Sequence, residues 1–239
     1  HRRQYVALKR RYKTALLLSQ PHGRLPPMPV RKVVGPVAVL GAGNWGTVIA
    51  LLASHQAERV YLFDRDRSRA EKIQTSRENT EYLPGFQLPA NILITNDLER
   101  ATKECQLLFP VVPSSSFRSF ARQFAPFTRG DHFLIHGTKG LEPHTFKRMS
   151  EILSEETNSI RIGALSGPNL AQELAEGKIG ASVVASRFNE VIVATQNTLA
   201  SNKLQIYGNH DLVGVEWAGA LKNILAVAAG ILHELGYGQ

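Results

Sequence analysis

Two lysines occupy positions where an ammonium group could move protons in a reaction. Lys139 lies in Gly137–Gly140, directly after a predicted buried strand, and ligands of open α/β sheets bind at the edge where the strands end. Lys222 lies within a long apolar stretch that predicts a helix. The residues that share its face at helical spacing are small and apolar: Val215, Ala218, Gly219, Ala226 and Ala229. If both lysines line one site, their mutual repulsion and their burial lower an amine pKa towards neutrality, where it can donate and accept protons.

Lys222 has an alternative interpretation. Its aliphatic stem could lie along a contact between helices while its ammonium group reaches solvent.

A glycine-rich turn follows the first predicted strand. Gly41, Gly43 and Gly46 occupy the glycine positions of a G-x-G-x-x-G pattern, and a predicted helix begins at its end. The pattern alone is weak, but a strand before it and a helix after it make it typical of dinucleotide binding. The first glycine permits the tight turn, the second lets a pyrophosphate approach the backbone, and the third lets helix and strand pack closely. A glycine-rich turn that binds no ligand is the alternative.

The residues after the second predicted strand bear on the choice of cofactor. Asp64 ends this strand, at the point where a carboxylate can accept hydrogen bonds from the adenosine ribose. Such a carboxylate favours NAD and repels the extra phosphate of NADP. Arg65 and Arg67 follow directly and could bind or neutralise that phosphate. A helix N-cap or a surface acid is the alternative for Asp64, so the choice between NAD and NADP stays open.

Short apolar runs alternate with helical segments along most of the chain. The predicted strands cover residues 37–40, 59–63, 92–94, 107–112, 132–135, 160–165 and 182–185. The predicted helices cover residues 45–53, 69–76, 97–104, 117–124, 145–153 and 212–235. This alternation indicates a parallel sheet with helices on both faces, and continuous apolar strands are typical of two-sided burial. The sequence therefore predicts an α/β fold: a Rossmann-type, doubly wound, mostly parallel sheet, followed by the first long helix of an all-α domain.

Charge and the change to one long helix from Leu212 divide the chain into three predicted parts. Residues 1–32 carry nine Lys or Arg and no acid, whereas the rest has 19 basic and 20 acidic residues. We therefore predict a basic, Pro-rich tail over residues 1–32, a dinucleotide-binding domain over 33–208 and the start of a helical substrate domain over 209–239. The tail is interpreted as a flexible or partner-binding segment, with an organelle transit peptide as the alternative.

Several classes of partner are not expected. The near-neutral balance after the tail predicts no basic face for nucleic acid. The single cysteine, Cys105, forms no disulfide within the chain and fits a reducing, cytoplasmic location, or an organelle if the tail is a transit peptide. The histidines lack metal-ligand spacing, so no metal site is predicted. Glu216, Lys222 and Asn223 make membrane insertion of the last helix costly, so we expect no transmembrane segment and a helix buried between two domains.

A series of short motifs resembles the NAD(P)-dependent glycerol-3-phosphate dehydrogenase family. The matching stretches run in order from Val37 to Gly238. Beyond the glycine turn they lie at residues 79–89, 112–117, 138–142, 166–174 and 219–223. The last two, Ser-Gly-Pro-Asn-Leu-Ala-Gln-Glu-Leu and Gly-Ala-Leu-Lys-Asn, are specific to this family or its close relatives. Together the motifs cover nearly all of the chain outside the tail.

The resemblance implies reduction of dihydroxyacetone phosphate to sn-glycerol-3-phosphate with NAD or NADP as the cofactor, feeding glycerophospholipid synthesis. Lys222 would be the proton donor and acceptor, with Lys139 as a second catalytic cation. Beside the three glycines and Asp64, the residues implied to contact the cofactor are Asn44, Trp45, Arg65, Phe117, Lys139 and Ala171. The residues implied to hold the small-molecule substrate are Lys139, Gly167, Asn169, Lys222 and Asn223. The resemblance also implies a homodimer of the full-length protein.

Two departures from the family pattern matter. Asn169 stands where many relatives have Thr or Ser. Family members also continue past the position of Gln239 with a helical region that supplies an arginine for the substrate phosphate, so we expect this chain to bind cofactor but to turn over poorly.

Two other hypotheses stay open. A related β-hydroxy-acid-type dehydrogenase, such as a ketopantoate reductase-like enzyme, should not carry Lys139 within Thr-Lys-Gly-Leu-Glu. A non-catalytic dinucleotide-binding module would need neither lysine.

Overall fold

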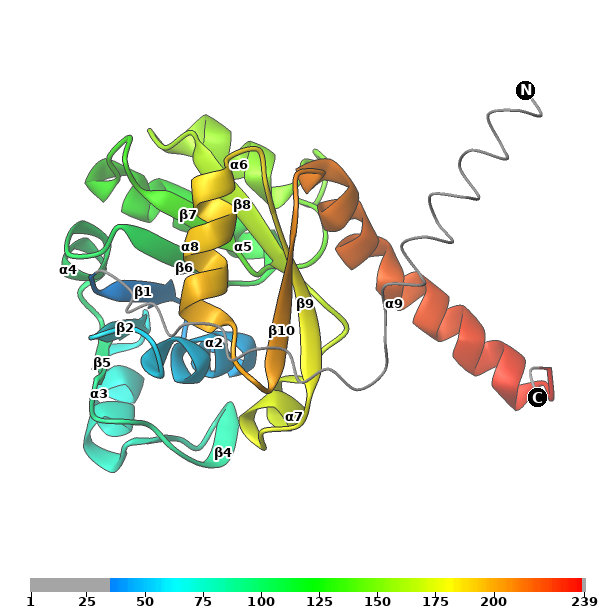
Figure 1. Cartoon of the computed structure of the whole chain (residues 1–239), viewed down its shortest axis with the longest axis horizontal. Helices are drawn as coiled ribbons and strands as arrows, with labels where there is room; N and C mark the ends of the chain where they lie inside the picture. Colours follow the sequence, from blue (N-terminus) through cyan, green and yellow to red (C-terminus); the bar gives the residue numbers. More distant parts are fainter. Residues whose placement is uncertain (1–34, 238–239) are drawn as a thin grey trace, which may run out of the picture. The chain divides into compact units, whose positions relative to one another are not determined.

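The computed structural model describes residues 35–237, so the predicted tail over residues 1–32 lies outside the described residues. The described part is built on one eight-stranded sheet (Figure 1). Its strands are β1 (Val37–Leu40), β2 (Val60–Phe63), β5 (Ile92–Thr95), β6 (Leu107–Pro110), β7 (Phe133–His136), β8 (Arg161–Ser166), β9 (Gly180–Ser186) and β10 (Leu204–Asn209).

The strand order confirms the predicted doubly wound, mostly parallel sheet. It runs β10-β9-β8-β7-β6-β1-β2-β5, and every neighbouring pair is parallel except the antiparallel pair of β8 and β9. The order reverses at β1, because β2 lies on one side of it and β6 on the other. In open α/β sheets, ligands bind beyond the carboxyl ends of the strands at such a reversal.

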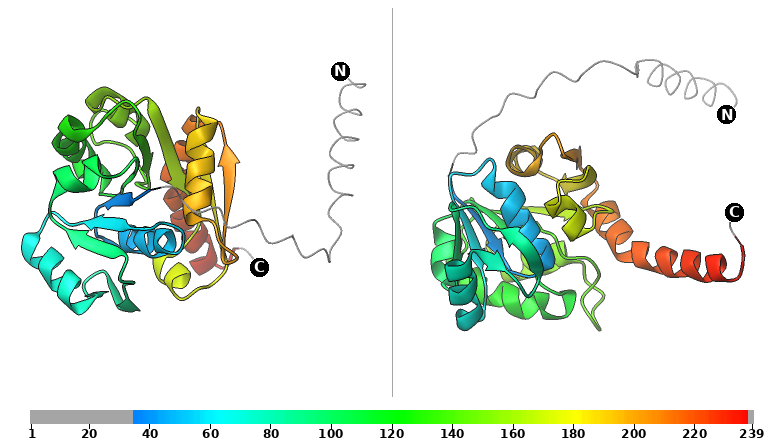
Figure 2. Two further views of the ribbon diagram at one scale, coloured as in Figure 1. Left: turned by 60° about the vertical axis from the view of Figure 1, so that its left-hand side comes forward. Right: turned by 90° about the horizontal axis from the view of Figure 1, so that it is seen from below.

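Helices cover both faces of the sheet (Figure 2). They are α2 (Asn44–Ser54), α3 (Arg67–Ser76), α4 (Leu98–Lys103), α5 (Ser114–Phe124), α6 (Met149–Glu156), α7 (Ala171–Ala175), α8 (Asn189–Leu199) and α9 (Leu212–Glu234), with a short 3-10 turn, η1 (Ala125–Phe127). One buried apolar cluster joins the sheet to α2, α3 and α8. A second joins the opposite face to α4, α5 and α6.

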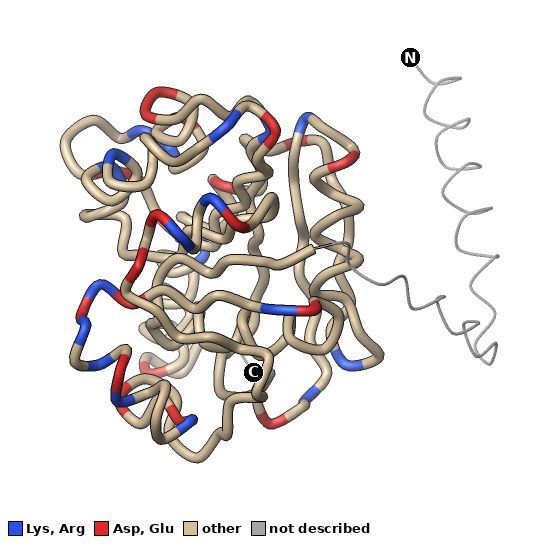
Figure 3. Tube along the Cα trace, turned by 90° about the vertical axis from the view of Figure 1, so that its left-hand side faces the viewer, with Lys and Arg blue, Asp and Glu red and all other residues tan. Residues whose placement is uncertain are grey.

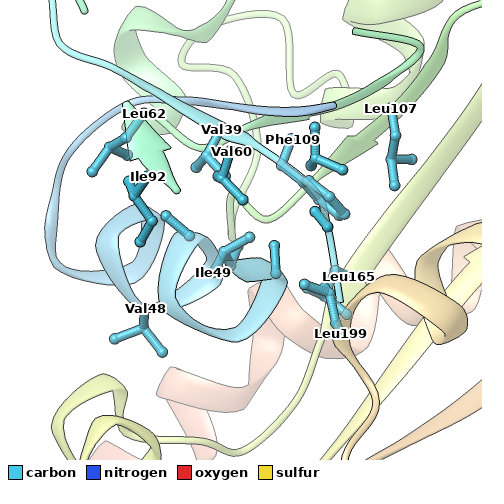
Figure 4. Close-up of a cluster of buried hydrophobic side chains, with 14 of the residues drawn as sticks. Val39, Val48, Ile49, Val60, Leu62, Ile92, Leu107, Phe109, Leu165 and Leu199 are labelled. Carbon is cyan, nitrogen blue, oxygen red and sulfur yellow. The ribbon is translucent and has the colours of Figure 1, made fainter. Parts of the chain in front are cut away.

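The strands supply both clusters because successive side chains of a strand point to opposite faces. In β1, Val37 and Val39 belong to the first cluster, whereas Ala38 and Leu40 belong to the second. Figure 4 shows part of the first cluster, in which Val39 lies near Ile49 of α2. Every residue of β1 is fully buried, which explains why its sequence is continuously apolar instead of alternating.

Four features of the chain were not predicted. Three of them, α7, α8 and β10, lie in its later part. The fourth is a separate antiparallel hairpin between α3 and β5, formed by β3 (Glu78–Asn79) and β4 (Leu83–Gln87). The edge strand β10 buries only Leu204 and Ile206, so it lacks the continuous apolar run of the central strands. The boundary predicted at residue 208 falls inside this strand, which ends at Asn209.

Two helices begin three or more residues away from the predicted start. The helix predicted over 145–153 begins only at Met149, because His144 and Phe146 adopt φ angles of 70° and 56°. These left-handed conformations are incompatible with a right-handed helix, so the prediction was wrong for the first turn. In contrast, α5 begins at Ser114, directly after Pro113 and three residues earlier than predicted.

Helix α9 is packed on the sheet only near its start. Its buried residues are Leu212, Glu216 and Gly219, and it contacts β8 and β9, beyond which it continues (Figure 2). Within the described residues only its first turns lie over strands, and burial of the helix between two domains stays a prediction. Among residues 35–237, α9 is the one helix long and apolar enough to cross a membrane. This is weak evidence of a span, since core helices of soluble proteins have the same composition.

Basic and acidic residues are mixed over the described chain (Figure 3). The densest group lies where α5 meets α6 and the loop after β7. There Arg118 binds Glu142 at 2.7 Å, Glu155 at 2.8 Å, and Glu156. The hydrogen bond from Arg118 lowers the pKa of Glu142 to about 2, against the opposing effect of burial. These ion pairs hold the loop that carries Lys139 against α5 and α6.

Candidate functional site

A cavity of about 420 Å³ opens at the carboxyl ends of β1, β6, β7 and β8, beside the reversal of strand order. Each of these strands contributes the residues that follow it. The lining residues are Gly43, Asn44, Trp45, Gly46, Val111, Val112, Pro113, Ser114, Gly137, Thr138, Lys139, Leu165, Ser166, Gly167, Asn169 and Ala171. The cavity therefore brings the glycine turn and Lys139 together, although they are far apart in the sequence.

The three glycines of the turn serve different structural needs. Gly41 has a φ of +132°, and a Cβ there would lie within 3.0 Å of the Val111 carbonyl oxygen. A Cβ on Gly46 would collide with the Gly41 carbonyl oxygen. Gly43, in contrast, has open space around its Cβ position, and it precedes α2 without capping it through a side chain. The free N–H groups at the start of α2 are thus accessible to an anion such as a pyrophosphate.

Asn79 braces this turn from the β3–β4 hairpin. Its Nδ2 donates to the Ala42 carbonyl oxygen and to Thr47 Oγ1, both at 2.8 Å. The Thr47 hydroxyl in turn donates to the Gly43 carbonyl oxygen at 2.8 Å. Asn79 is 1% exposed, so these bonds are shielded from water and hold the turn against the hairpin.

Trp45 forms one wall of the cavity together with Gly137. A Cβ on Gly137 would lie 2.8 Å from Trp45 Nε1, so only a glycine lets the indole ring lie against the end of β7. Asn44, the first residue of α2, is exposed and also lines the cavity.

The carboxylate predicted to bind ribose is engaged by an arginine instead. Asp64 is 2% exposed, and Arg69 of α3 binds both of its oxygens, at 2.6 Å through Nε and 2.8 Å through Nη2. The backbone N–H of Asp66 donates to the same carboxylate at 2.9 Å. The N-cap of α3 is Asp66, which accepts from the Arg69 N–H at 3.0 Å. Arg65, Asp66 and Arg67 are all exposed, so two basic side chains and one acidic side chain face solvent directly after β2.

Lys139 stands in the cavity wall at the end of β7. Its ammonium donates to the Gly167 carbonyl oxygen at 3.3 Å, and the residue remains accessible to solvent. Burial lowers the pKa of Lys139, and the positive charge of Lys222 lowers it further. The two lysines, from separate elements, are thus within reach of each other's charge.

Lys222 and Asn223 continue the packed face of α9. Glu216 and Gly219 are buried three residues apart, and the next positions on that face of a helix are 222 and 223. A Cβ on Gly219 would lie 2.9 Å from Ser166 Oγ, so this glycine lets α9 approach the end of β8. Lys222 and Asn223 are exposed and are not among the residues that line the cavity.

Glu216 was interpreted from the sequence only as an obstacle to membrane insertion. In the structure its buried carboxylate accepts four hydrogen bonds. Its carboxylate accepts from the backbone N–H and the hydroxyl of Ser150, at 2.9 and 2.6 Å. It also accepts from His136 Nε2 at 3.0 Å and from Arg148 Nη1 at 2.8 Å. Burial raises the pKa of Glu216, but the hydrogen bonds from His136 and Ser150 outweigh it and hold that pKa below its ordinary value.

The motif after β8 is fixed to β9 by its own asparagine. Asn169 Nδ2 donates to the Ala181 carbonyl oxygen at 2.9 Å and to Ser182 Oγ at 2.7 Å, and its Oδ1 accepts from the Ala181 N–H at 3.2 Å. A Cβ on Gly167 would lie 2.7 Å from the same carbonyl oxygen. A substrate contact through the Asn169 side chain would therefore have to replace a bond that shapes this loop.

Four residues implied for the cofactor do not line the cavity: Gly41, Asp64, Arg65 and Phe117. Asn44, Trp45, Lys139 and Ala171 line the cavity, but Phe117 is 1% exposed and belongs to the second apolar cluster. The apolar positions of α5 recur every three or four residues, and this face turns Phe117 towards the sheet. Its ring packs edge-on against His136, with centroids 6.0 Å apart. Phe117 is therefore buried against His136 and does not line the cavity, and its contact with the cofactor stays a prediction.

Sequence reasoning missed several polar residues of the cavity wall, among them Ser114, Thr138 and Ser166. The Thr138 hydroxyl donates to the Val112 carbonyl oxygen at 2.7 Å, which ties the loops after β6 and β7 together. These residues all stand within four positions of the end of a strand, so their place in the chain was the available signal.

Comparisons with known proteins point to one family. Residues 36–192 match the profile of the NAD-dependent glycerol-3-phosphate dehydrogenase N-terminus, and residues 211–239 match that of its C-terminus. The glycerol-3-phosphate dehydrogenase, NAD(P)+, of Teredinibacter turnerae is 45% identical over 203 residues, which cover 85% of this chain and 60% of the relative. The enzyme of the same name from Pseudomonas aeruginosa is 43% identical over 205 residues, with the same coverage. The chain thus spans about 60% of the length of these curated relatives.

Solved structures give the same result. A glycerol-3-phosphate dehydrogenase from Coxiella burnetii superimposes with a TM-score of 0.78 at 30% identity, over 88% of this chain and 64% of that one. A glycerol-3-phosphate dehydrogenase from Plasmodium falciparum gives 0.79 at 27% identity, over 86% and 61%. A ketopantoate reductase from Ralstonia eutropha gives 0.55 at 16% identity, over 77% and 59%, a likeness of fold alone.

Proposed function

This chain belongs to the NAD-dependent glycerol-3-phosphate dehydrogenase family, and we propose that it serves the NAD(P)H-dependent reduction of dihydroxyacetone phosphate to sn-glycerol-3-phosphate, and the reverse oxidation. The observation that carries the proposal is the shared cavity. A dinucleotide-type glycine turn and Lys139 line it together, and Lys222 stands within reach of the Lys139 charge.

The glycine turn fits NAD or NADP. The pyrophosphate would lie over Gly43, whose open Cβ position leaves room for it, and at the uncapped start of α2. Asn44, Trp45 and Ala171 would contact the cofactor inside the cavity, and Arg65 and Asp64 would stand at its adenosine end. When bound, the cofactor supplies or accepts the hydride at the substrate carbon, and the protein aligns and polarises the substrate.

The two lysines would handle the charge and the proton at the ketone oxygen. In the reduction, Lys222 donates a proton to this oxygen, and in the oxidation it takes the hydroxyl proton back. Lys139 adds a second positive charge next to the oxygen, where negative charge develops in the transition state. Its lowered pKa is consistent with two ammonium groups that share one site. Gly167, Asn169 and Asn223 would complete the substrate contacts.

The two profile matches support a division at the end of the sheet. We assign residues 33–208 to a dinucleotide-binding domain and residues 209–239 to the start of a helical substrate domain, with matches over 36–192 and 211–239. A cytoplasmic location, a homodimer and a product that enters glycerophospholipid synthesis extend the same proposal.

Turnover by the full-length protein tests the function directly. NADH and NADPH absorbance is followed with dihydroxyacetone phosphate and, separately, with ketopantoate. We expect oxidation with the triose phosphate only, and a loss of about a hundredfold or more in kcat for Lys222→Ala, as for removal of a general acid. Lys203→Ala, an exposed lysine before β10, is the matched control and should be neutral. Oxidation with ketopantoate alone, or binding without turnover, would reject the proposal.

Cofactor binding is measured on the 239-residue chain itself. The sequence has two tryptophans, Trp45 and Trp217, so Trp217→Phe leaves the cavity residue Trp45 as the single fluorophore. NADH should quench its emission in a saturable manner, with poor turnover by this chain. An emission that NADH leaves unchanged would contradict the assignment of the glycine turn to the cofactor.

A further inference from the structure

Helix α9 is held on the sheet by a narrow face. Leu212, Glu216 and Gly219 are its buried residues, and Gly219 brings the helix against Ser166. Glu216 is the one charged residue among these three buried residues. It lies six residues, or roughly 9 Å of helix axis, before Lys222. A helix is rigid over this length. The contacts of Glu216 therefore set the position of Lys222 relative to the end of the sheet.

Both oxygens of the Glu216 carboxylate are fully used. Oε1 accepts from His136 Nε2 and the Ser150 N–H, while Oε2 accepts from Arg148 Nη1 and the Ser150 hydroxyl. The side chain is 4% exposed and that of Arg148 is 16% exposed. These four donors come from β7 and from the start of α6. They therefore determine the distance of α9 from the sheet and its rotation about the helix axis.

The same contacts reach the loop that carries Lys139. His136, the last residue of β7, places its other ring nitrogen, Nδ1, 3.2 Å from the Thr138 carbonyl oxygen. Lys139 follows Thr138 directly. One imidazole therefore contacts the carboxylate of α9 on one side and the backbone of the Lys139 loop on the other, and Phe117 packs edge-on against this ring.

We propose that Glu216 is a positioning residue, whose buried carboxylate joins α9 through His136 to the Lys139 loop and thereby sets where Lys222 stands relative to Lys139. This inference rests on the proposed function for its catalytic meaning, but the geometry it describes belongs to the chain alone. Glu216 and His136 do not line the cavity. They act through the two lysines.

The choice of a carboxylate favours positioning over simple attachment. An apolar side chain would hold α9 on β8 as firmly, because a buried ion pair often gives no net stability over well-packed apolar residues. A carboxylate with four donors, in contrast, is satisfied in only one arrangement of helix, strand and loop. An attachment role predicts that variants lose stability alone, whereas a positioning role predicts that they also change the titration of Lys139.

The test measures that titration in the 239-residue chain without cofactor. Lysines are dimethylated with ¹³C, which keeps their charge, and the Lys139 signal is assigned by its loss in Lys139→Arg. Lys222→Gln should raise the Lys139 pKa, because it removes the neighbouring positive charge. Glu216→Gln should also raise it, because α9 shifts and carries Lys222 away. Glu234→Gln, at the exposed far end of the same helix, is the matched control and should leave the Lys139 signal unchanged.

A second pair of variants guards against a folding defect in Glu216→Gln, which circular dichroism would reveal. His136→Gln keeps an N–H donor near the place of Nε2, so it should retain the parent titration. His136→Leu has no donor, so it should raise the Lys139 pKa. Neither variant touches Arg148, which continues to neutralise the carboxylate.

The outcomes separate this inference from the proposed function. A Lys139 titration that moves in Lys222→Gln but not in Glu216→Gln or His136→Leu would overturn the positioning role. In the full-length enzyme, His136→Leu should lower kcat by roughly tenfold or more, as expected for a misplaced catalytic group, with an unchanged dissociation constant for NADH. If the full-length protein shows no turnover at all, the proposed function fails, while the titration still decides whether Glu216 positions the lysines.

Discussion

The glycine turn and the lysine helix border the same site but are held in place in different ways. The turn is fixed by backbone contacts: Gly41 and Gly46 leave no room for a Cβ, and Asn79 binds the carbonyl oxygen between them. Helix α9 is fixed by the buried side chain of Leu212, by one glycine contact and by the hydrogen bonds of one carboxylate, Glu216. The first region is rigid because of residues that lack side chains, and the second because of side chains that meet from distant parts of the chain.

This difference suggests how the two regions should respond to substitution. A glycine contact fails as soon as an atom is added, since a packed backbone has no space to yield. A buried carboxylate fails when one of its donors is removed, because the remaining charge is then left without compensation.

Gly46→Ala should be the most damaging substitution. Its Cβ would collide with the Gly41 carbonyl oxygen, so we expect roughly 3 kcal/mol of destabilisation, as for overpacking of a core, and the loss of measurable NADH binding. Gly43→Ala is the matched control, because nothing lies within 4 Å of its Cβ position. It should keep the parent stability in urea and weaken only NADH binding. Equal stability of both variants would contradict the rigid-turn account.

Arg148→Met tests the carboxylate on the other side of the comparison. Glu216 would lose its cationic partner while it stays buried, which should cost about 2 kcal/mol of unfolding free energy at neutral pH. The pKa of Glu216 in the folded chain lies below its ordinary value of 4.5. Its contribution to stability is therefore complete above pH 4.5 and is lost as the pH falls through the folded-state pKa.

Urea unfolding of both proteins at several pH values measures this effect. The difference between parent and Arg148→Met should be constant above pH 4.5 and shrink below it, because a protonated Glu216 gains little from the arginine. A difference that does not change with pH would show that Arg148 stabilises the chain by packing alone.

The contrast also explains what the sequence could predict. The glycine turn was predictable because its three glycines and the flanking strand and helix lie within one short segment. The central strands were predictable because two-sided burial requires continuous apolar runs. The Glu216 contacts were not predictable, since His136, Arg148 and Ser150 have no fixed spacing from position 216 and meet it only through the folded topology.

Asp64 shows the same limit at the cofactor end. Its position after β2 fits a ribose-binding carboxylate, but the sequence does not reveal that Arg69, five residues later on the first turn of α3, folds back onto it. A residue type at the right position thus predicts a site, whereas its free or engaged state depends on neighbours that only the structure places.

Arg69→Leu tests the consequence of that pairing. It releases the Asp64 carboxylate for the ribose hydroxyls, so the ratio of NADH to NADPH affinity should rise by about tenfold, the effect of roughly one charge contact. Arg67→Leu removes the same charge from an exposed pair with Glu71 and is the matched control. Titration of Trp45 fluorescence with both nucleotides measures the ratios. An equal rise in both variants would attribute the change to net charge and not to Asp64.

The smallest effect is expected on α9 beyond its packed face. Leu225 is 70% exposed, so Leu225→Ser should change the unfolding free energy of the 239-residue chain by less than about 0.5 kcal/mol. Leu212 is 9% exposed at the start of the same helix, and Leu212→Ala should cost roughly 2 kcal/mol. Urea unfolding at two protein concentrations measures both. A loss of stability in Leu225→Ser that depends on concentration would show that a second copy covers this part of the helix, and that Glu216 is not the last contact that holds α9.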